Sequence, residues 1–517
     1  MILAVDQGTT GTKAAVYDEA LVCTARSRRR VRLRHPRPGW VESDPEVLFE
    51  SVVAAGREAL RKAGAAGHKT AFFGLANQGE TVVAWDRRTG RAVSPAISWQ
   101  CSRGVEYCAE VARTLPPAAV HERTGLRLDP YFSAVKLRWI VENIPEARTL
   151  AAKGRLAVGT TDAWIVWRLT GGKSFVTDAS TASRTLLFDI RALRWDNDLL
   201  DAFGIARAWL PAPVDTCGPA LGTVRRSVWG KPLKITAMVC DQPAAAFGHL
   251  MFDPGACKCT YGTGAFVQAL TGDDPRLDRS GRLLTSIAWK TGPRPVYLLD
   301  GAVFAAAAAL EWLARVTRRR ATMHAALNRV LRRVPAELRP LCIPAFTGLG
   351  APHWLPEASA EFRNLTLSAT ADDLLRAVAQ GVALCVADVV DALRDEYGVA
   401  PAGLLADGGL AGSASFLRYQ ANILGLPVIA ARDVNVTGRG CAMLAGLGAG
   451  LWTMDDLRRE KSPRRRIAPD PACPYSANHL LQWRKARADF AAREQAVASV
   501  METDAEAARR ERRRTHL

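Results

Sequence analysis

The sequence predicts an α/β protein made of two related domains that face each other across a cleft. Strand-like and helix-like segments alternate along the chain, which is typical of layered α/β folds. Two glycine-threonine turns, each between two apolar runs, occur about half a chain apart, at residues 8–11 and 262–264. A repeated hairpin of this kind indicates two domains of one design, and 517 residues exceed what a single core accommodates.

The first turn lies within residues 6–13, Asp-Gln-Gly-Thr-Thr-Gly-Thr-Lys, directly after the apolar run 2–5. Glycines let the backbone approach an anion, and threonine hydroxyls and turn N–H groups donate hydrogen bonds to phosphate oxygens. Asp6, at the strand end, can hold a divalent metal through its waters. The spacing differs from that of a P-loop and of a dinucleotide-binding loop. We therefore predict a phosphate-binding β-hairpin, with an ordinary Gly-Thr hairpin turn as the alternative.

The second turn separates the runs 257–261 and 265–267, and a third glycine-rich turn, after 404–406, leads into a helix. We expect the second turn to hold phosphate and the third to serve the nucleoside end. The strand 234–239 leads into Asp241 and sets the predicted domain boundary. The predicted units are an N-terminal domain, 1–238, on the substrate and phosphate side, a C-terminal domain, 239–460, on the nucleotide side, and a basic segment, 461–517, with a proline-rich linker, a helix from about residue 477 and a tail.

The composition excludes several classes of protein. Hydrophobic residues make up 48% and charged residues 23%, which is ordinary for a globular chain. No apolar run reaches the roughly 18–20 residues that span a bilayer, and the alanine-rich run 302–310 predicts a buried helix instead. The N-terminus begins with a strand rather than an export signal, so we expect a cytoplasmic protein.

The net charge of +18 favours anionic substrates over nucleic acid. Aromatic residues make up only 7%, and no nucleic-acid-binding motif occurs. The eleven cysteines lack metal-binding spacing, which favours reduced thiols. We therefore expect a small-molecule substrate and neither a membrane nor a nucleic-acid partner, while a homo-oligomer is left open.

Asp241 is the first candidate for catalysis, because it follows a strand and precedes a helix that begins Gln242-Pro243. A carboxylate at such a junction faces the mouth of a cleft and can accept a proton from a substrate hydroxyl. Aspartate is also among the best N-cap residues, and a proline two positions on suits a first helical turn. Both interpretations remain open, and they are compatible.

A second cluster consists of Glu80, Trp99 and Tyr131, each at the end of a predicted element. Glu80 can accept hydrogen bonds from hydroxyl groups, and the two aromatic residues can form an apolar wall with a polar tip. For each residue alone, a loop contact or a core position is the alternative. Their combination with the phosphate turns indicates a substrate pocket.

These segments together resemble the FGGY carbohydrate kinase family, across roughly residues 2–455, and within it they are most similar to the glycerol kinases. Residues 131–143 fit the first family signature without a mismatch. Glycerol-kinase-like sequence recurs at 38–42, 159–164, 182–185 and 344–352. The resemblance implies two actin-like, ribonuclease-H-like ATPase domains with an interdomain cleft that closes on ATP, Mg²⁺ and a small polyol or sugar.

The resemblance also assigns roles to individual residues. Asp241 matches the catalytic base, and Asp6 matches the carboxylate near the magnesium. The substrate positions are Glu80, Tyr131, Asp241 and Gln242, with Trp99 and Phe266 packing on the substrate. The ATP positions are Thr9, Thr10, Gly11, Lys13, Thr263, Ala307, Gly409 and Ser413.

Several residues depart from the family pattern. Gly79 stands where glycerol kinases typically carry an arginine that binds the substrate hydroxyls, so a cationic donor is lost and volume is opened. This departure predicts either a substrate larger than glycerol or weak binding of glycerol. Lys13, Ala307 and Ser413 also differ from the usual residues, which predicts an altered affinity for ATP rather than a different reaction.

The predicted function is the ATP-dependent phosphorylation of a terminal hydroxyl of glycerol or a related small polyol, glycerol giving sn-glycerol 3-phosphate. One alternative within the family is a kinase for a four- or five-carbon polyol or ketose. The alternative of another class is a catalytically weak nucleotide-binding regulatory protein, which the altered ATP positions favour and the intact Asp241 and Glu80 disfavour.

Overall fold

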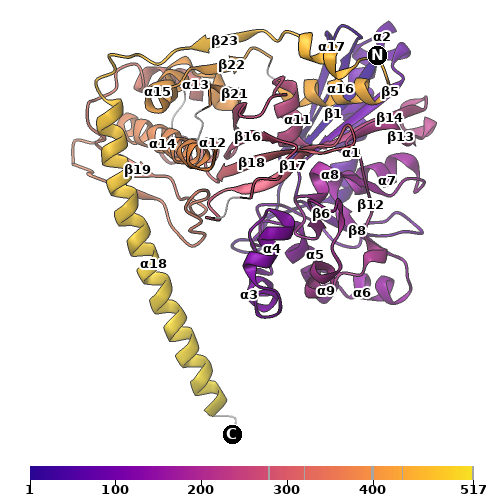
Figure 1. The fold of residues 1–517 in the computed structure, drawn as a ribbon, viewed down its shortest axis with the longest axis horizontal. Helices are drawn as coiled ribbons and strands as arrows, with labels where there is room; N and C mark the ends of the chain where they lie inside the picture. The colour runs from indigo at the N-terminus through magenta and orange to yellow at the C-terminus, as the bar shows by residue number, and fades with distance from the viewer. Residues whose placement is uncertain (278–279, 319–320, 398–400, 434, 515–517) are drawn as a thin grey trace.

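The computed structural model describes residues 1–517 apart from 278–279, 319–320, 398–400, 434 and 515–517. Two mixed sheets organise the chain, one in each half (Figure 1). The predicted α/β class with two domains is confirmed. No helix among the described residues combines the length and the apolar composition that crossing a bilayer requires.

The N-terminal sheet has the strand order β13-β14-β5-β1-β2-β3. Its strands are β1 (Ile2–Gly8), β2 (Gly11–Tyr17), β3 (Cys23–Arg30), β5 (Phe72–Asn77), β13 (Cys217–Val224) and β14 (Leu233–Cys240). The helices of this half are α1 (Pro45–Lys62), α2 (Ala65–Lys69), α3 (Val105–Thr114), α4 (Pro117–Thr124), α5 (Ser133–Asn143), α6 (Pro145–Ala152), α7 (Thr161–Thr170), α8 (Ala179–Ala182), α9 (Asn197–Phe203) and α10 (Arg226–Trp229). Helix α1 packs against β1, β2 and β3.

This half also contains a smaller sheet with the order β4-β7-β6-β8. It consists of β4 (Glu42–Ser43), β6 (Val82–Asp86), β7 (Ala96–Ile97) and β8 (Leu156–Thr160). Two separate strand pairs are β9 (Val176–Asp178) with β12 (Ala212–Val214), and β10 (Phe188–Asp189) with β11 (Arg194–Trp195). Helix α5 packs on β6 and β8. Glu80 follows β5, Trp99 follows β7 and Tyr131 precedes α5, and all three residues line one cavity.

The C-terminal sheet has the order β17-β18-β16-β15-β21-β22-β23. Its strands are β15 (Cys257–Tyr261), β16 (Ala265–Gly272), β17 (Leu284–Trp289), β18 (Val296–Val303), β21 (Leu404–Gly408), β22 (Val428–Ala431) and β23 (Arg464–Ile467), and β19 (Leu341–Ile343) pairs separately with β20 (Glu361–Arg363). The helices are α11 (Asp241–Gly248), α12 (Ala307–Val316), α13 (Met323–Val330), α14 (Ala371–Tyr397), α15 (Ala414–Leu424), α16 (Val436–Gly448), α17 (Met454–Arg459) and α18 (Ser476–Arg514).

The two large sheets repeat one pattern. In each, a hairpin pairs antiparallel with a third strand and parallel with a later one: β1 and β2 with β3 and β5, and β15 and β16 with β18 and β21. The two predicted hairpins therefore occupy equivalent places. The third glycine turn also lies as predicted, between β21 and α15.

Two sequence-based expectations were wrong. The stretch 461–475, predicted as a linker, contains β23, which pairs antiparallel with β22 as β13 does with β14. This pairing provides hydrogen-bond partners for the backbone groups along the edge of β22, which would otherwise be unpaired. The run 302–310, predicted as one helix, is divided between the end of β18 and the start of α12. The predicted C-terminal helix is present as α18, and the last three residues of the tail lie outside the described residues.

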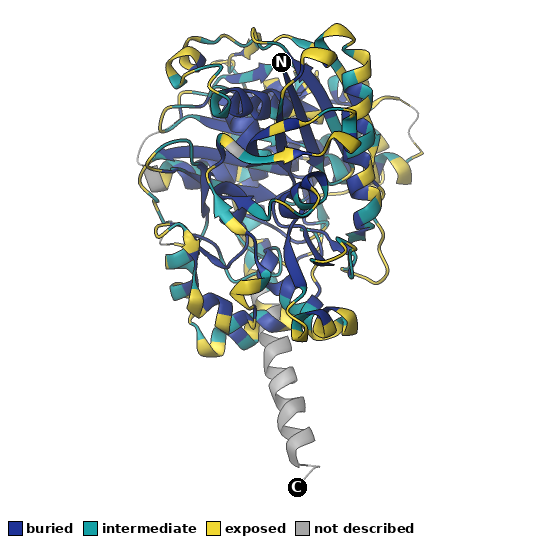
Figure 2. Ribbon diagram, turned by 90° about the vertical axis from the view of Figure 1, so that its right-hand side faces the viewer, coloured by how far each residue is buried: buried dark blue, intermediate teal, exposed yellow. Residues whose placement is uncertain are grey.

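Helices α11 and α16 form the layer between the two large sheets. Helix α16 lies on β1, β5 and β14 and packs against α11. One hydrophobic cluster includes Ala4 and Ala76 of the N-terminal sheet, Phe247 of α11, Leu444 of α16 and Leu298 of the C-terminal sheet. The burial colours of Figure 2 show this interior as a continuous buried region. The two halves therefore share a core, and α11 carries its first residue, Asp241, to their junction.

Helices α11 and α16 touch backbone to backbone at two glycines. A Cβ on Gly440 would lie 1.9 Å from the carbonyl oxygen of Ala244, and a Cβ on Gly248 would lie 2.2 Å from that of Val436. Main-chain atoms inside a helix cannot move aside as a flexible side chain can. Glycine is therefore required at this crossing.

We expect Gly440→Ala to lower the thermal unfolding midpoint, because overpacking at a backbone contact costs about 1–3 kcal/mol or more. Differential scanning calorimetry measures the change. Gly292→Ala is the matched control, since a Cβ there meets nothing within 4 Å. Equal unfolding midpoints for the two variants would contradict the close contact.

Candidate active site

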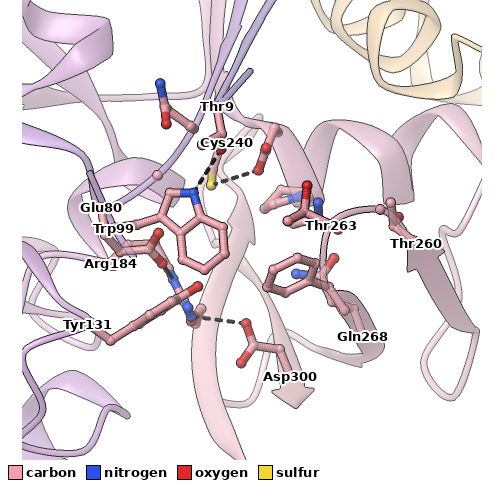
Figure 3. Close-up of a pocket in the computed structure, with 18 of the residues that line it drawn as sticks. Thr9, Glu80, Trp99, Tyr131, Arg184, Cys240, Thr260, Thr263, Gln268 and Asp300 are labelled. Atoms are coloured by element: carbon pink, nitrogen blue, oxygen red, sulfur yellow. Dashed lines mark hydrogen bonds and ion pairs between the residues drawn. The ribbon is translucent and has the colours of Figure 1, made fainter. Parts of the chain in front are cut away.

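A cavity of about 180 Å³ lies where the two halves meet. Its walls come from the β1–β2 turn, the segment after β5, the start of α11, the β15–β16 hairpin and strands β17 and β18 (Figure 3). The volume suits a small polar molecule rather than a whole nucleotide. The lining residues include nine of the predicted site residues: Thr9, Thr10, Glu80, Trp99, Tyr131, Asp241, Gln242, Thr263 and Phe266.

The two predicted phosphate turns line the same cavity. Thr9 and Thr10 come from the turn between β1 and β2, and Gly262 and Thr263 come from the turn between β15 and β16. The indole N–H of Trp99 donates a 2.8 Å hydrogen bond to Thr9 Oγ1. This bond ties the first phosphate turn to the aromatic side of the cavity.

Asp241 is the first residue of α11, directly after β14. The N-cap position belongs to Cys240, and no side-chain capping bond is present at this helix start. The N-cap interpretation of Asp241 is therefore wrong. Its carboxylate lines the cavity, where Cys240 Sγ is 3.8 Å from Asp241 Oδ1.

The surroundings of Asp241 raise the pKa of its carboxylate. Burial raises its pKa to about 7, and the nearby charges of Asp6 and Glu80 act in the same direction. The ammonium group of Lys258 opposes them. A group whose pKa lies near the working pH is well suited to take a proton from a hydroxyl.

Lys258 is a buried residue of β15 that sequence reasoning did not single out. Its Nζ donates to Gln242 Oε1 at 2.6 Å and to Thr260 Oγ1 at 2.8 Å. Burial lowers the pKa of Lys258. Because the amide oxygen of Gln242 is already engaged, the amide nitrogen is the group that Gln242 can offer to a ligand.

Arg184 is the second residue that sequence reasoning missed, although it lies in the quoted segment 182–185. Its Nε donates to Glu80 Oε1 at 2.7 Å, and its Nη1 donates to Asp300 Oδ2 at 3.0 Å and Ser286 Oγ at 2.7 Å. Burial lowers the pKa of Arg184, but the charges of Asp300 and Glu80 outweigh burial and raise it. One guanidinium group thus joins carboxylates from both halves of the molecule.

Gly79 lies directly beside this guanidinium-bearing side chain. A Cβ on Gly79 would lie 2.9 Å from Cys240 Sγ and 3.5 Å from Arg184 Cγ. The space along that direction is therefore occupied, and the expectation that Gly79 simply opens volume was wrong there. Arg184 is a cationic side chain that lines the same cavity.

Aromatic rings form the side of the cavity opposite the start of α11. Trp99 packs edge to face on Tyr131 and on Phe266, with centroid distances of 5.6 and 5.8 Å. Tyr131 also stacks on Phe304 at 6.4 Å. These rings come from both halves of the molecule, and they include the two predicted packing residues, Trp99 and Phe266.

Three residues of the first hairpin lie beside the cavity rather than in its wall. Lys13 Nζ donates to Asp6 Oδ2 at 3.2 Å, and Asp6 raises the pKa of Lys13. The two residues are directly opposite each other in the β1–β2 register, so the turn sequence alone could have revealed this pair. A Cβ on Gly11 would lie 2.6 Å from the carbonyl oxygen of Arg29, which explains this glycine by strand packing.

The remaining predicted ATP residues surround the second hairpin. The N–H of Ala307 donates to the carbonyl oxygen of Gly262, at 3.1 Å, so α12 begins at the phosphate turn. Gly409 accepts a hydrogen bond from His324. Ser413 is the N-cap of α15 and bonds Asn328 Oδ1 at 2.9 Å, so its hydroxyl serves the protein itself.

Comparisons with known proteins agree with this architecture. The model of the N-terminal domain of the FGGY family of carbohydrate kinases matches residues 1–248, and the model of its C-terminal domain matches residues 257–449. Glycerol kinase of Leptothrix cholodnii is 38% identical over 94% of this chain and 98% of its own length. That of Methylobacterium nodulans is 40% identical over 94% and 97%.

Solved structures show the same similarity. Plasmodium falciparum glycerol kinase, crystallised with ADP, superposes with a TM-score of 0.84 and 29% identity, covering 95% of this chain and 98% of its own. Xylulose kinase from Rhodospirillum rubrum gives a TM-score of 0.79 and 26% identity over 95% and 98%. The chain belongs to the FGGY family of carbohydrate kinases. It is an ATP-dependent phosphotransferase with the actin-like fold of that family.

We expect Arg184→Lys to lower kcat/KM for the phosphate acceptor about 100-fold. An ammonium group keeps the charge but cannot bridge Glu80 and Asp300 as the planar guanidinium does, and disrupting a buried ion pair costs about 3–5 kcal/mol at most. Steady-state kinetics with varied acceptor and varied ATP separate the effect on each substrate. The KM for ATP should stay within about twofold.

Arg123→Lys is the matched control, because Arg123 also bridges two carboxylates, Asp196 and Asp198, but away from the cavity. An unchanged acceptor kcat/KM in Arg184→Lys, or an equal loss in the control, would show that the Arg184 bridge does not shape the acceptor site.

Proposed function

We propose that this protein transfers the γ-phosphoryl group of ATP to a terminal hydroxyl of glycerol or a related small polyol, glycerol giving sn-glycerol 3-phosphate. The observation that carries the proposal is the position of Asp241, a buried carboxylate with a pKa raised to about 7 in a small cavity bordered by both predicted phosphate hairpins. The relatives named glycerol kinase support glycerol as the first substrate to test.

The reaction follows from the groups in the cavity. Asp241 accepts the proton of the substrate hydroxyl, the hydroxyl oxygen attacks the γ-phosphorus, and the bond from phosphorus to the bridging oxygen of ADP breaks. Thr9, Thr10 and Thr263, on the two turns, supply hydroxyl and backbone donors for the phosphate oxygens. The base and the donors are in place before the substrate arrives, so little reorganisation is needed.

The substrate is oriented by the polar side of the cavity. Glu80 accepts hydrogen bonds from hydroxyl groups, and the amide nitrogen of Gln242 donates to them while its oxygen is held by Lys258. Trp99 and Phe266 cover the carbon chain. These contacts exclude water, which would otherwise compete as the phosphate acceptor.

Magnesium fits the acidic side of this site. Asp6 raises the pKa of Asp241, so the two carboxylates repel each other across the site. The described residues contain no group of three or more potential ligands for a metal ion. Mg²⁺ commonly binds through one or two carboxylates together with phosphates and water. Asp6 is therefore the residue we propose to hold the ion, which would neutralise phosphate charge when bound.

The adenosine end is proposed to lie beyond the second hairpin, near Gly409 and the starts of α12 and α15. Ala307 and Ser413 border this region through the contacts described above. Because the Ser413 hydroxyl and the Lys13 ammonium are bonded within the protein, we propose that they act by positioning the backbone and Asp6 rather than by direct contact with ATP.

We expect Asp241→Asn to lower kcat by about 10²- to 10⁴-fold, the usual contribution of a general base. The affinity for ATP, measured by isothermal titration calorimetry, should remain within about twofold because Asp241 is not at a phosphate turn. Asp201→Asn, at an exposed position, is the control. Full kinase activity of Asp241→Asn would reject Asp241 as the base. An unchanged cellular role of a variant that has lost turnover would instead favour the nucleotide-binding regulatory protein.

We expect kcat/KM for the polyol to rise with pH up to about 7 and then to level off. Asp241 must be ionised to accept a proton, and burial raises its pKa to about 7, so the active form is lost as the pH falls below this value. The profile is measured between pH 5.5 and 9 at saturating ATP and Mg²⁺, with circular dichroism verifying the fold at each pH. A flat profile across this range would contradict the assignment of Asp241 as the base.

A further inference from the structure

Two residues that line the cavity each carry a buried side-chain oxygen without a hydrogen-bond partner among the described residues, Gln268 Oε1 and Asp300 Oδ1. The Gln268 side chain is 3% exposed. A buried acceptor without a donor is unfavourable, and most buried polar side-chain atoms in proteins are paired. Two such acceptors in one cavity indicate that a bound molecule supplies the missing donors.

The two residues form one polar surface. Gln268 of β16 and Asp300 of β18 are directly opposite each other in the antiparallel register, so their side chains leave the sheet on the same face. Phe266, two residues before Gln268 on β16, lies on this face as well and lines the cavity. Gln268 and Asp300 are labelled together at the lower right of Figure 3, next to the Arg184 interaction.

Asp300 also connects this surface to the proposed acceptor site. One carboxylate oxygen, Oδ2, accepts from Arg184 Nη1, while the same guanidinium donates through Nε to Glu80. The guanidinium group therefore lies between Glu80, which we assign to the substrate hydroxyls, and the carboxylate of Asp300 with its unpartnered Oδ1. The polar lining continues past Glu80 toward β16 and β18.

We propose that Gln268 and Asp300 form a second hydroxyl-binding subsite, which selects polyols of four or five carbons over glycerol. This inference rests on the proposed polyol kinase function. A three-carbon chain held at Glu80 and Asp241 has no further hydroxyl to place against Gln268, whereas a longer chain has. Both unpartnered atoms are hydrogen-bond acceptors, so they can bind a hydroxyl group, which donates, but not a carbonyl oxygen, which only accepts. The subsite therefore favours polyols over ketoses that would place their carbonyl group at this end.

The test compares kcat/KM for glycerol, erythritol, threitol, xylitol and xylulose in the wild type and in Gln268→Leu. In the wild type, a four- or five-carbon polyol should have the highest kcat/KM. Gln268→Leu should lower kcat/KM for that polyol about tenfold, because one hydrogen bond is lost. Glycerol should change by less than about twofold, which also shows that the variant is folded.

Gln268→Met, which keeps the length of the side chain, is the second variant, and Gln380→Leu is the matched control. Gln380 is equally buried and also has an unpartnered side-chain atom, but it lies in α14 and does not line the cavity. A glycerol optimum in the wild type, or an equal loss for all substrates in both Gln268 variants, would overturn the subsite. No turnover of any of these compounds by the wild type would contradict the kinase function itself and the subsite with it.

Discussion

The buried guanidinium of Arg184 is the interaction on which the cavity depends. It joins Glu80 in the N-terminal half to Asp300 and Ser286 in the C-terminal half. Two carboxylates buried side by side would repel each other, and a cation between them removes this repulsion. Arg184 thus links both sides of the cavity, and the second carboxylate oxygen of Asp300 has no hydrogen-bond partner among the described residues.

The same balance of buried charges sets the chemistry at Asp241. Burial and two neighbouring carboxylates disfavour its ionised form, and Lys258 moderates their effect. With a pKa of about 7, the ionised carboxylate binds a proton more strongly than an ordinary aspartate does, and part of it is still ionised at neutral pH. Lys258 performs a second task, since its hydrogen bond orients the amide of Gln242. The proposed base and the proposed binding residues are thus held by one interior network of charges and hydrogen bonds, whose members come from several segments of the chain.

Local features were predicted well from the sequence because short-range rules govern them. Glycine and threonine between two apolar runs favour a hairpin, and both hairpins lie where they were expected. The strand before Asp241 and the helix after Tyr131 follow from periodicity in the same way. The family resemblance added roles for these residues, and nine of the assigned residues line one cavity.

Long-range contacts could not be predicted in this way. Arg184 is 104 residues from Glu80 and 116 from Asp300, and nothing in either local sequence indicates that they meet. Strand β23 was not predicted, because prolines flank it and its pairing with β22 depends on the tertiary position of both segments. The consequence of Gly79 was also misjudged, since the atoms that would meet a side chain there belong to Cys240 and Arg184.

The amino-acid sequence by itself determined the α/β class, the repeated phosphate hairpins and the candidate base, because each depends on residues that are neighbours in the chain. Only the tertiary structure decided which charges share the cavity. Burial and distance set the strength of electrostatic interactions, and both arise when the two halves pack around α11 and α16. The pKa of Asp241, the Arg184 bridge and the unpartnered oxygens of Gln268 and Asp300 are therefore properties of the folded chain.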